Sequence, residues 1–441
     1  MRTDPVTEAY LRACARPGDP LRTAARRLEF EHFYGRTWGA RQLARPLFVP
    51  QRHLDEAAAD LRALHRLVFE LPERLYGGDT AALCAELGMS PRATELACRA
   101  EAAGRTPLYI RPDLYYDGER FTLLELNSGS EVGGVDSAAV NEAYLALPEF
   151  RDFAKEHQLG YADLGERIAG FLRTMAAPVT GGGDPVVALV DISANLDAWR
   201  EHYEAFAAHM APRGIEIRVC HIADLGTAAD GRLTAGGTPI DVALRYFTLE
   251  EMVAEPRCDE WLAPVLRAHE AGRTIFFASF DYGIHANKGL LAILSERRAA
   301  GAFTEEESAV IDRLLPWTRR VTPELWEHCR AEREHLLLKP TTGGGGGGIT
   351  TGWEVTDAEW EAAWGSALRR PFIVQRRAAV RLEPVPDGPD GALTAWLPVY
   401  GIFVFDDGYA GTFVRTLPAT VGNVVNVNTG AAFTTVFSYE E

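Results

Sequence analysis

The sequence contains few cysteines, and none of them has the spacing of a metal or redox site. The 441 residues include six, with no C-x-x-C pair among them: Cys14, Cys84, Cys98, Cys220, Cys258 and Cys329. Paired spacings mark zinc ribbons and thiol oxidoreductases, and dense cysteines mark disulfide-rich secreted domains, so these classes are disfavoured. We expect free thiols, each buried as a small apolar side chain, in a cytoplasmic protein.

Long apolar runs and an excess of positive charge are also missing. No segment approaches the roughly 20 apolar residues that span a bilayer. The start, Met1–Pro5, carries an early acid with no apolar run behind it, unlike a secretory signal. Acidic residues outnumber Lys and Arg by 62 to 45, giving a net charge of −17. We therefore expect no membrane and no nucleic-acid partner, although a nucleotide is compatible because only the local field at its site matters.

The pattern of apolar residues divides the chain into four regions: 1–104, 105–180, 181–278 and 279–441. The first is predicted to be helical, and its clearest segment is a helix over 53–71 that Pro72 ends. A glycine-rich break precedes the third region, where strands alternate with a helix. This alternation predicts a small parallel α/β domain. Its expected strands are 186–190, 215–219 and 240–247.

Six consecutive glycines form the most unusual stretch. An apolar, strand-like segment leads to Lys339, and the glycine loop begins four residues later. The loop consists of Gly343, Gly344, Gly345, Gly346, Gly347 and Gly348. Residues 349–355 alternate like a second strand, so the loop is predicted to be the tip of a β-hairpin. Ordering a glycine costs roughly 0.5–1 kcal/mol relative to alanine, but backbone N–H groups without a Cβ can approach a phosphate.

A flexible linker is the plain alternative for such a run. The flanking strands and the adjacent lysine favour the hairpin, because linkers join domains rather than strands. A Walker loop places its lysine after the glycines, whereas Lys339 precedes them. No helix follows directly, as a dinucleotide-binding turn would require. A hairpin that folds over a triphosphate, as in an ATP-grasp lid, fits better.

A second hairpin, predicted over 108–127, carries two carboxylates and an amide. Arg111 and Asp113 share one face of its first strand, and Glu125 and Asn127 share one face of its second. A two-residue turn would put Asp113 and Glu125 on opposite faces, whereas a three-residue loop would bring Arg111 opposite Glu125. We therefore predict an odd-length loop or a bulge. The oxygens suit Mg²⁺; solvated surface charges are the alternative, which Asn127 disfavours because Asn is depleted in strands.

Three further side chains stand at positions suited to a nucleotide. Lys288 begins an apolar helix, where a cation is unfavourable unless an anion lies alongside. Gln375 lies near the end of a predicted strand whose backbone can follow an adenine edge. Arg415 lies near the end of another strand, and its guanidinium suits a phosphoryl group. A solvated position is the alternative for both cations.

These stretches resemble the circularly permuted ATP-grasp ligases of the glutathionylspermidine synthase type, in patches over roughly residues 105–441. Arg111-x-Asp113 and Glu125-x-Asn127 have the family's twelve-residue step from Asp to Glu. The carboxylates precede the lid lysines, as the permutation requires. The resemblance implies an α+β / α/β fold, a circularly permuted ATP-grasp with an N-terminal helical region and a small parallel α/β (pre-ATP-grasp) domain. The first hundred residues show no Cys/His arrangement of the family's amidase domain.

The resemblance also implies roles for the residues. The implied Mg²⁺ ligands are Asp113, Glu125 and Asn127. The implied ATP contacts are Lys288, Lys339, the glycine loop and Gln375. The implied catalytic residues are Arg111, which faces the phosphates and the acyl group, and Arg415, which binds phosphate.

The implied activity is that of an ATP-dependent carboxylate–amine ligase. A substrate carboxylate would attack the γ-phosphorus to give an acyl phosphate and ADP, and an amine would then displace phosphate to form an amide. Catalysis would come from positioning and charge neutralisation, so no nucleophilic residue is expected. A kinase on the same fold and a non-catalytic nucleotide-binding partner protein are the alternatives. The sequence leaves open which small-molecule or peptide acid and amine react, and the oligomeric state.

Overall fold

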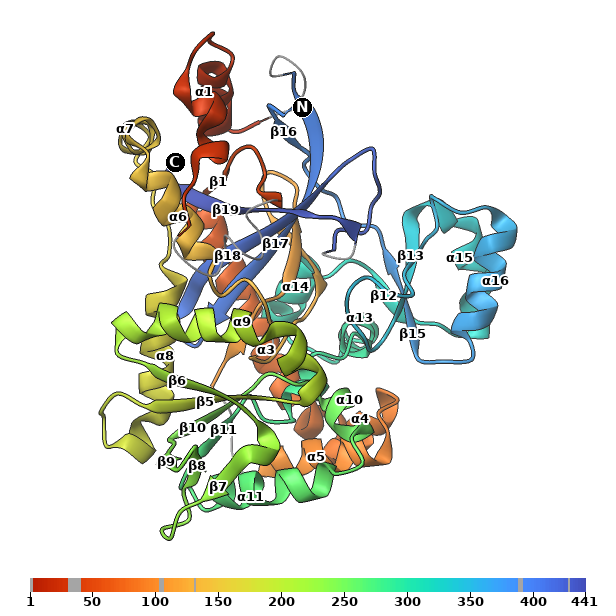
Figure 1. The fold of residues 1–441 in the computed structure, drawn as a ribbon. Coiled ribbons are helices and arrows are strands. Elements are labelled where there is room, and N and C mark those ends of the chain that lie inside the picture. The colour runs from red at the N-terminus through yellow and green to blue at the C-terminus, as the bar shows by residue number, and fades with distance from the viewer. Residues whose placement is uncertain (1–2, 31–40, 103–106, 131, 388–391, 427–428) are drawn as a thin grey trace.

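A large mixed β-sheet forms the centre of the molecule (Figure 1). The computed structural model describes residues 3–30, 41–102, 107–130, 132–387, 392–426 and 429–441, so every predicted region except 181–278 has some residues outside the described ranges. The strand order is β1-β19-β18-β17-β3-β4, and β2 and β16 also pair with β17. The bounds are β1 Leu47–Pro50, β2 Tyr109–Ile110, β3 Asp113–Tyr116, β4 Phe121–Glu125, β16 Glu383–Val385, β17 Thr394–Phe405, β18 Gly408–Pro418 and β19 Ala432–Tyr439.

Helices cover both faces of this sheet. α3 (Gln51–Tyr76) packs on β17 and β18 from one side, while α6 (Ser137–Ala146) and α8 (Leu164–Thr180) pack from the other. Because strand side chains alternate, neighbouring residues of β18 enter different cores. Phe413 joins the core with α6 and α8, and Val414 joins the core with α3. β1 lies in the region predicted to be helical, and it pairs in parallel with β19.

The helix predicted over 53–71 is longer in the structure. α3 continues through Pro72, ends at Tyr76, and is followed by Gly77 in the left-handed conformation with φ 62°. The prediction that Pro72 ends this helix is therefore wrong. Pro72 is buried together with Leu71, and this packing offsets the backbone hydrogen bond that proline cannot donate. The other N-terminal helices are α1 Pro5–Cys14, η1 Pro20–Arg27, α4 Thr80–Glu86 and α5 Pro91–Ala102.

The small parallel sheet expected in the third region is confirmed, with the order β11-β10-β5-β6. α8 and α9 cover one face and α11 the other, as parallel sheets require. Its strands and helices are β5 Val186–Asp191, α9 Ser193–Met210, β6 Glu216–His221, β10 Val242–Arg245, α11 Cys258–Glu270 and β11 Ile275–Phe277. A small antiparallel extension follows β6, with strands β7 Leu225–Thr227, β8 Leu233–Ala235 and β9 Thr238–Pro239. The connecting helices are α7 Pro148–Glu156, α10 Leu249–Ala254, α12 Tyr282–His285, α13 Gly289–Ala299 and α14 Glu305–Leu314.

A four-stranded antiparallel sheet, which we call the lid, projects beside the large sheet, on the right of Figure 1. Its elements are β12 Thr318–Arg320, α15 Trp326–Ala331, β13 Leu336–Pro340, β14 Thr350–Thr351, α16 Asp357–Ala367 and β15 Phe372–Arg376. Trp360 and Trp364 of α16 pack on one face of the sheet. The glycine hairpin is confirmed by the pairing of β13 with β14. Its second strand, predicted over 349–355, has two residues because the chain turns where Glu354 N donates to Thr351 O at 3.1 Å.

No helix in the described ranges is long and apolar enough to cross a membrane. All six cysteines are free thiols. Four of them are buried as expected, whereas Cys98 and Cys220 are only half-buried.

Candidate active site

A bulge in the acidic hairpin brings its two carboxylates together. β3 and β4 are joined by a four-residue loop, 117–120, and their register shifts by one so that Asp113 lies directly opposite Glu125. The bulge confirms one predicted alternative, while the odd-length loop and the pairing of Arg111 with Glu125 are wrong. Leu124 is the extra residue that turns Glu125 to the face of Asp113. Without it, the carboxylates would lie on opposite faces of the hairpin.

Asp113 is held between two arginines. Arg415 Nη2, from β18, donates to Asp113 Oδ2, and Arg111 Nη2 lies 3.5 Å from Asp113 Oδ1. Gly401 of β17 lies opposite Asp113, and a Cβ there would be 3.0 Å from Arg111 Cδ, so this glycine makes room for the arginine. Burial lowers the pKa of Arg111, and the nearby Arg415 lowers it further. Burial also opposes the charge of Arg415, but its ion pair with Asp113 raises the pKa of Arg415.

Glu125 lies near the charges of two lysines. Lys288 Nζ lies 3.1 Å from Glu125 Oε2. Burial alone would raise the pKa of Glu125, but Lys288 and Lys339 lower it to about 2, so the carboxylate stays ionised. Lys339 Nζ donates to the carbonyl of Leu124, the bulged residue, at 3.0 Å. Burial lowers the pKa of Lys339 to about 8. The hairpin and the lid therefore meet through a lysine beside the carboxylates.

The side chain of Gln375 forms hydrogen bonds with two other residues of the lid sheet. Its Oε1 accepts from Lys339 Nζ at 2.9 Å, and its Nε2 donates to Thr318 Oγ1 at 3.1 Å. Leu337 pairs with Gln375 across β13 and β15, so Lys339 is its diagonal neighbour on the same face. The adenine contact implied for Gln375 stays a prediction. Thr318 is absent from the sequence-based predictions because its partner is distant in the chain.

The glycine loop closes on the hairpin. Lys288 Nζ donates to Gly343 O at 2.8 Å, which ties the loop to the lysine that binds Glu125. Gly346 has a φ of +74°, and a Cβ there would lie 2.6 Å from Val424 Cγ1. At Gly346 the loop therefore packs against Val424, in the segment that precedes β19.

Replacing Gly346 with alanine is expected to destabilise the folded protein by about 1–2 kcal/mol, because alanine is strained at positive φ and its Cβ would meet Val424. Gly347→Ala is the matched control, since its φ is not positive and the nearest atom to a Cβ is Gly344 O at 3.7 Å. Urea unfolding of both variants measures the difference. Equal free energies of unfolding would contradict the described conformation of the loop.

Two cavities meet at these ion pairs. The lid cavity, about 110 Å³, is lined by the two carboxylates together with Lys339, Gln375, Arg415 and Gly346. The basic cavity, about 440 Å³, is lined by Arg111, Asn127, Lys288, Gly343 and Gly344, and by Arg245 and Glu250 of the small α/β domain. The pairs Arg111–Asp113 and Lys288–Glu125 thus form a wall between the two cavities. The carboxylates of these pairs line the lid cavity, and their cations line the basic cavity. Gly345, Gly347 and Gly348 line neither of these cavities within the described ranges.

The carboxylates are suited to a hard cation. Among the described residues, no three His, Cys, Asp or Glu side chains form a group that could hold a metal, so a cation here would use Asp113 and Glu125 with other oxygens. Asp113 Oδ1 is buried and has no hydrogen-bond donor in the described structure, which a bound cation would satisfy. Asn127 lines the basic cavity, and its Oδ1 would be the metal ligand, whereas its Nδ2 is a donor that is buried without an acceptor there and suits a phosphate oxygen. Two carboxylates and an amide fit Mg²⁺, which takes its remaining ligands from phosphate and water.

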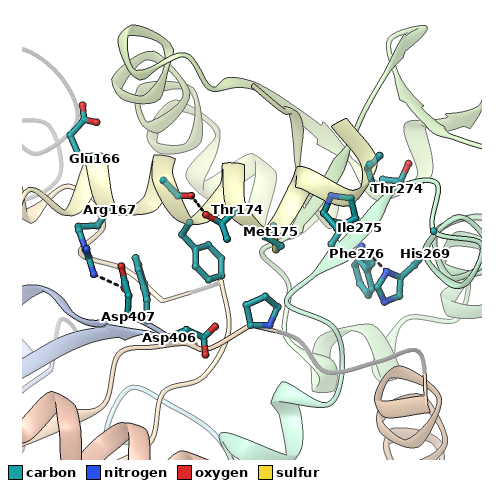
Figure 2. Close-up of a pocket in the computed structure, with 17 residues that line it drawn as sticks. Glu166, Arg167, Thr174, Met175, His269, Thr274, Ile275, Phe276, Asp406 and Asp407 are labelled. Carbon is teal, nitrogen blue, oxygen red and sulfur yellow. Dashed lines mark hydrogen bonds and ion pairs between the residues drawn. The ribbon is translucent and has the colours of Figure 1, made fainter. Parts of the chain in front are cut away.

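A larger cavity lies elsewhere (Figure 2). It measures about 820 Å³ and is bounded by α8, the start of β11 and the turn between β17 and β18. Phe171 and Phe276 form part of its apolar wall, and Arg167 Nη2 pairs with Asp407 Oδ1 at 2.6 Å at its side. None of the predicted site residues, all of which are described, lines this cavity. Volume alone would therefore select a different region from the one that holds the predicted site residues.

The small number of lysines is a further sequence signal of the site. Of the 45 Lys and Arg residues, only three are lysines: Lys155, Lys288 and Lys339. Lys155 is exposed, and the other two converge beside Glu125. In a chain that otherwise uses arginine for its positive charge, two of only three lysines beside one carboxylate indicate a position that is suited to a compact ammonium.

A model of the family described as "Glutathionylspermidine synthase preATP-grasp" matches residues 44–426. The chain belongs to this family. As a member of it, the protein is an ATP-dependent ligase that acts on small-molecule substrates. No curated protein matches the sequence.

One solved structure supports the fold. A glutathione synthetase-like effector (GSS30) from Globodera pallida, in its apo form, is 11% identical with a TM-score of 0.59, and the match covers 99% of this chain and 98% of that chain. A candidate γ-glutamylcysteine synthetase from Methylobacillus flagellatus KT is 13% identical with a TM-score of 0.47, covering 89% of each chain. The first match, together with the family, confirms the expected α+β fold of the ATP-grasp type.

Proposed function

We propose that this protein joins a carboxylic acid to an amine through an acyl phosphate, with ATP as the phosphoryl donor and ADP and phosphate as products. The wall of ion pairs between the two cavities is the observation that carries the proposal. It separates a lid side with carboxylates, suited to a magnesium nucleotide, from a side lined by Arg111 and Lys288, suited to an acid. A phosphoryl group transferred across this wall would meet cations on both sides.

The residues divide the work of binding the nucleotide. Lys288, Lys339 and the glycine loop would hold the triphosphate, and Arg415 would stabilise charge on the transferred group. Asp113, Glu125 and Asn127 would hold Mg²⁺, which supplies neutralisation of the phosphate charge. The apolar side of the lid cavity would take the base; it includes Tyr115, Leu337, Trp353 and Val399.

Nucleotide entry requires the lid to move. At about 110 Å³ the lid cavity is smaller than the roughly 300 Å³ from which ligand pockets usually start. Opening breaks the contact of Lys288 with Gly343 and that of Lys339 with Leu124. Lys288 then becomes available to phosphate oxygens, and Lys339 would regain its contact with Leu124 when the lid closes. Closure afterwards would exclude water from the acyl phosphate.

The chemistry needs two displacements. An oxygen of the substrate carboxylate, oriented by Arg111, attacks the γ-phosphorus, and the bond to ADP breaks. The amine nitrogen then attacks the acyl carbon, the bond to phosphate breaks, and the amine loses a proton. Positioning and charge stabilisation account for both steps, so no nucleophilic side chain is required.

The proposal is tested by ADP release over a panel of carboxylic acids, each with hydroxylamine as the trapping amine. Acid-dependent ADP release with a hydroxamate product is the expected result, since hydroxylamine captures acyl phosphates. A stable phosphorylated product without hydroxamate would identify a kinase. Nucleotide binding with no substrate-dependent ADP release would identify a non-catalytic partner protein. Either outcome would contradict the proposal.

Nucleotide affinity is expected to fall in alkaline solution. Lys339, with a pKa of about 8, is charged below that value and neutral above it. A bound triphosphate favours the charged form and raises this pKa, so above pH 8 binding takes up a proton. The Kd for MgATP should therefore stay nearly constant up to about pH 7.5 and then rise by about tenfold per pH unit above pH 8. Calorimetric titration measures it, with Lys339→Met as the control that lacks this dependence. Parallel changes in the two proteins would contradict the assignment.

A further inference from the structure

Three side chains of the lid lie in a line across its sheet. Thr318 of β12 pairs directly with Gln375 of β15, and Gln375 pairs with Leu337 of β13. Lys339 is two residues beyond Leu337 and so faces the same side. The antiparallel register thus leads from Thr318 through Gln375 to the ammonium of Lys339.

The hydrogen bonds along this line have only one consistent direction. Thr318 Oγ1 donates its single hydrogen to Pro316 O at 2.8 Å, so towards Gln375 it acts as an acceptor. Gln375 Nε2 donates to it at 3.1 Å, which leaves Oε1 for Lys339 Nζ at 2.9 Å. A flipped amide would point its NH₂ group at an ammonium, which has no acceptor. The hydroxyl of Thr318 therefore sets the orientation of the Gln375 amide.

Burial makes this orientation consequential. Thr318 is 0% exposed, Gln375 1% and Lys339 6%. Solvent cannot replace a bond that the network loses, and an unpaired group in such a site is costly.

The ammonium of Lys339 has three N–H groups, and two directions are fixed by its acceptors. One bond goes to Leu124 O on the hairpin and one to Gln375 Oε1 on the lid. Two fixed bonds determine where the third N–H points. Lys339 lines the lid cavity, which the proposed function assigns to the nucleotide.

We propose that Thr318 is a positioning residue, which orients the Gln375 amide so that Lys339 directs its third N–H to a phosphate oxygen of the nucleotide. The residue acts through Gln375 and touches no substrate. The phosphate contact rests on the proposed function, whereas the orientation of Lys339 does not. Gln375 then serves the phosphate end of the nucleotide through a lysine, in addition to any contact with its base.

Kinetics of two variants test the nucleotide part. Thr318→Val keeps the shape of the side chain but removes the hydroxyl, and Thr318→Ser keeps the hydroxyl. In Thr318→Val the KM for ATP should rise by about tenfold, the effect of one misdirected charge-assisted hydrogen bond, with kcat within about threefold of wild type. Thr318→Ser should restore the KM to within about twofold. A normal KM in Thr318→Val, or equal damage in both variants, would overturn the proposal.

Lysine NMR tests the orientation without any nucleotide. Selective ¹³Cε labelling gives one signal for each of the three lysines, and Lys339→Met assigns the relevant one. Thr318→Val should move the Lys339 signal, Thr318→Ser should return it, and the exposed Lys155 should stay constant. An unmoved Lys339 signal would overturn the proposal. If Thr318→Val does not fold, Gln375→Met interrupts the same line and should give the same shift.

The proposed function and the role of Thr318 can be tested separately. Addition of a magnesium complex of a non-hydrolysable ATP analogue to the wild-type protein should move the Lys339 signal if the lid cavity is the nucleotide site. No movement on this addition contradicts the proposed function, while the shift caused by Thr318→Val still decides the orientation of Lys339.

Discussion

Lys339→Met is expected to lower acid-dependent ADP release by about 10³-fold, the upper range for loss of one buried group that stabilises developing charge. Methionine has a similar length and no charge, so the lid cavity keeps its shape. The lost groups are the ammonium beside Glu125 and its bonds to Leu124 O and Gln375 Oε1. The measurement is steady-state ADP release at saturating ATP and acid.

The exposed Lys155 provides the control for this prediction, because Lys155→Met removes the same charge from the surface. It should retain the wild-type rate. Wild-type rates in both variants would show that Lys339 is not part of the active site. An equal loss in both would point to net charge rather than to position.

Glu125→Gln is expected to reduce ADP release by a similar factor, about 10³-fold, and to raise the Mg²⁺ concentration needed for half-maximal rate. The carboxylate has a pKa of about 2 and stays charged at working pH, so the substitution removes a full negative charge. It leaves Lys288 and Lys339 facing a neutral amide and takes one oxygen from the proposed cation site. Rates measured over a magnesium titration separate the two effects.

Glu119→Gln is the matched control on the same hairpin, since Glu119 is exposed in the loop. Its magnesium dependence should equal that of the wild type. A Glu125→Gln variant with wild-type rate and magnesium dependence would contradict the assignment of the carboxylate pair.

In the acidic hairpin, the alternation of side chains along a strand predicts which residues share a face but does not predict the register between the strands. The period of two predicts that Arg111 and Asp113 share one face, and that either an odd-length loop or a bulge brings Glu125 to the same side. The register was not predictable, because the loop length depends on local bonds that sequence spacing does not encode. Asp117 Oδ1 accepts from Glu119 N at 2.8 Å and Arg120 N at 2.9 Å, which stabilises a four-residue loop.

The lid was predictable in outline because its signals are local. A strand, a lysine and six glycines predict a hairpin, and β13 with β14 confirm it. The contact of Lys288 with Gly343 O joins residues 55 apart in the chain, and that of Gln375 with Lys339 joins residues 36 apart. Such partners follow from how the sheets are arranged, which composition and spacing do not specify.

The pairing of β1 with β19 was beyond prediction for a related reason. Leu47–Pro50 is only four residues long and apolar throughout, so it has no alternation that distinguishes a strand from a helical turn. Its partner lies at the other end of the chain. A short parallel strand is recognised by what it pairs with, and only the folded sheet supplies that.

A crystal structure with Mg²⁺ and a non-hydrolysable ATP analogue tests the central claim most directly. We expect the triphosphate to lie within hydrogen-bond distance of Lys288 and Lys339 under the glycine loop, with the metal ion bound by Asp113 and Glu125. A nucleotide bound elsewhere, such as in the 820 Å³ cavity beside α8, would contradict this account.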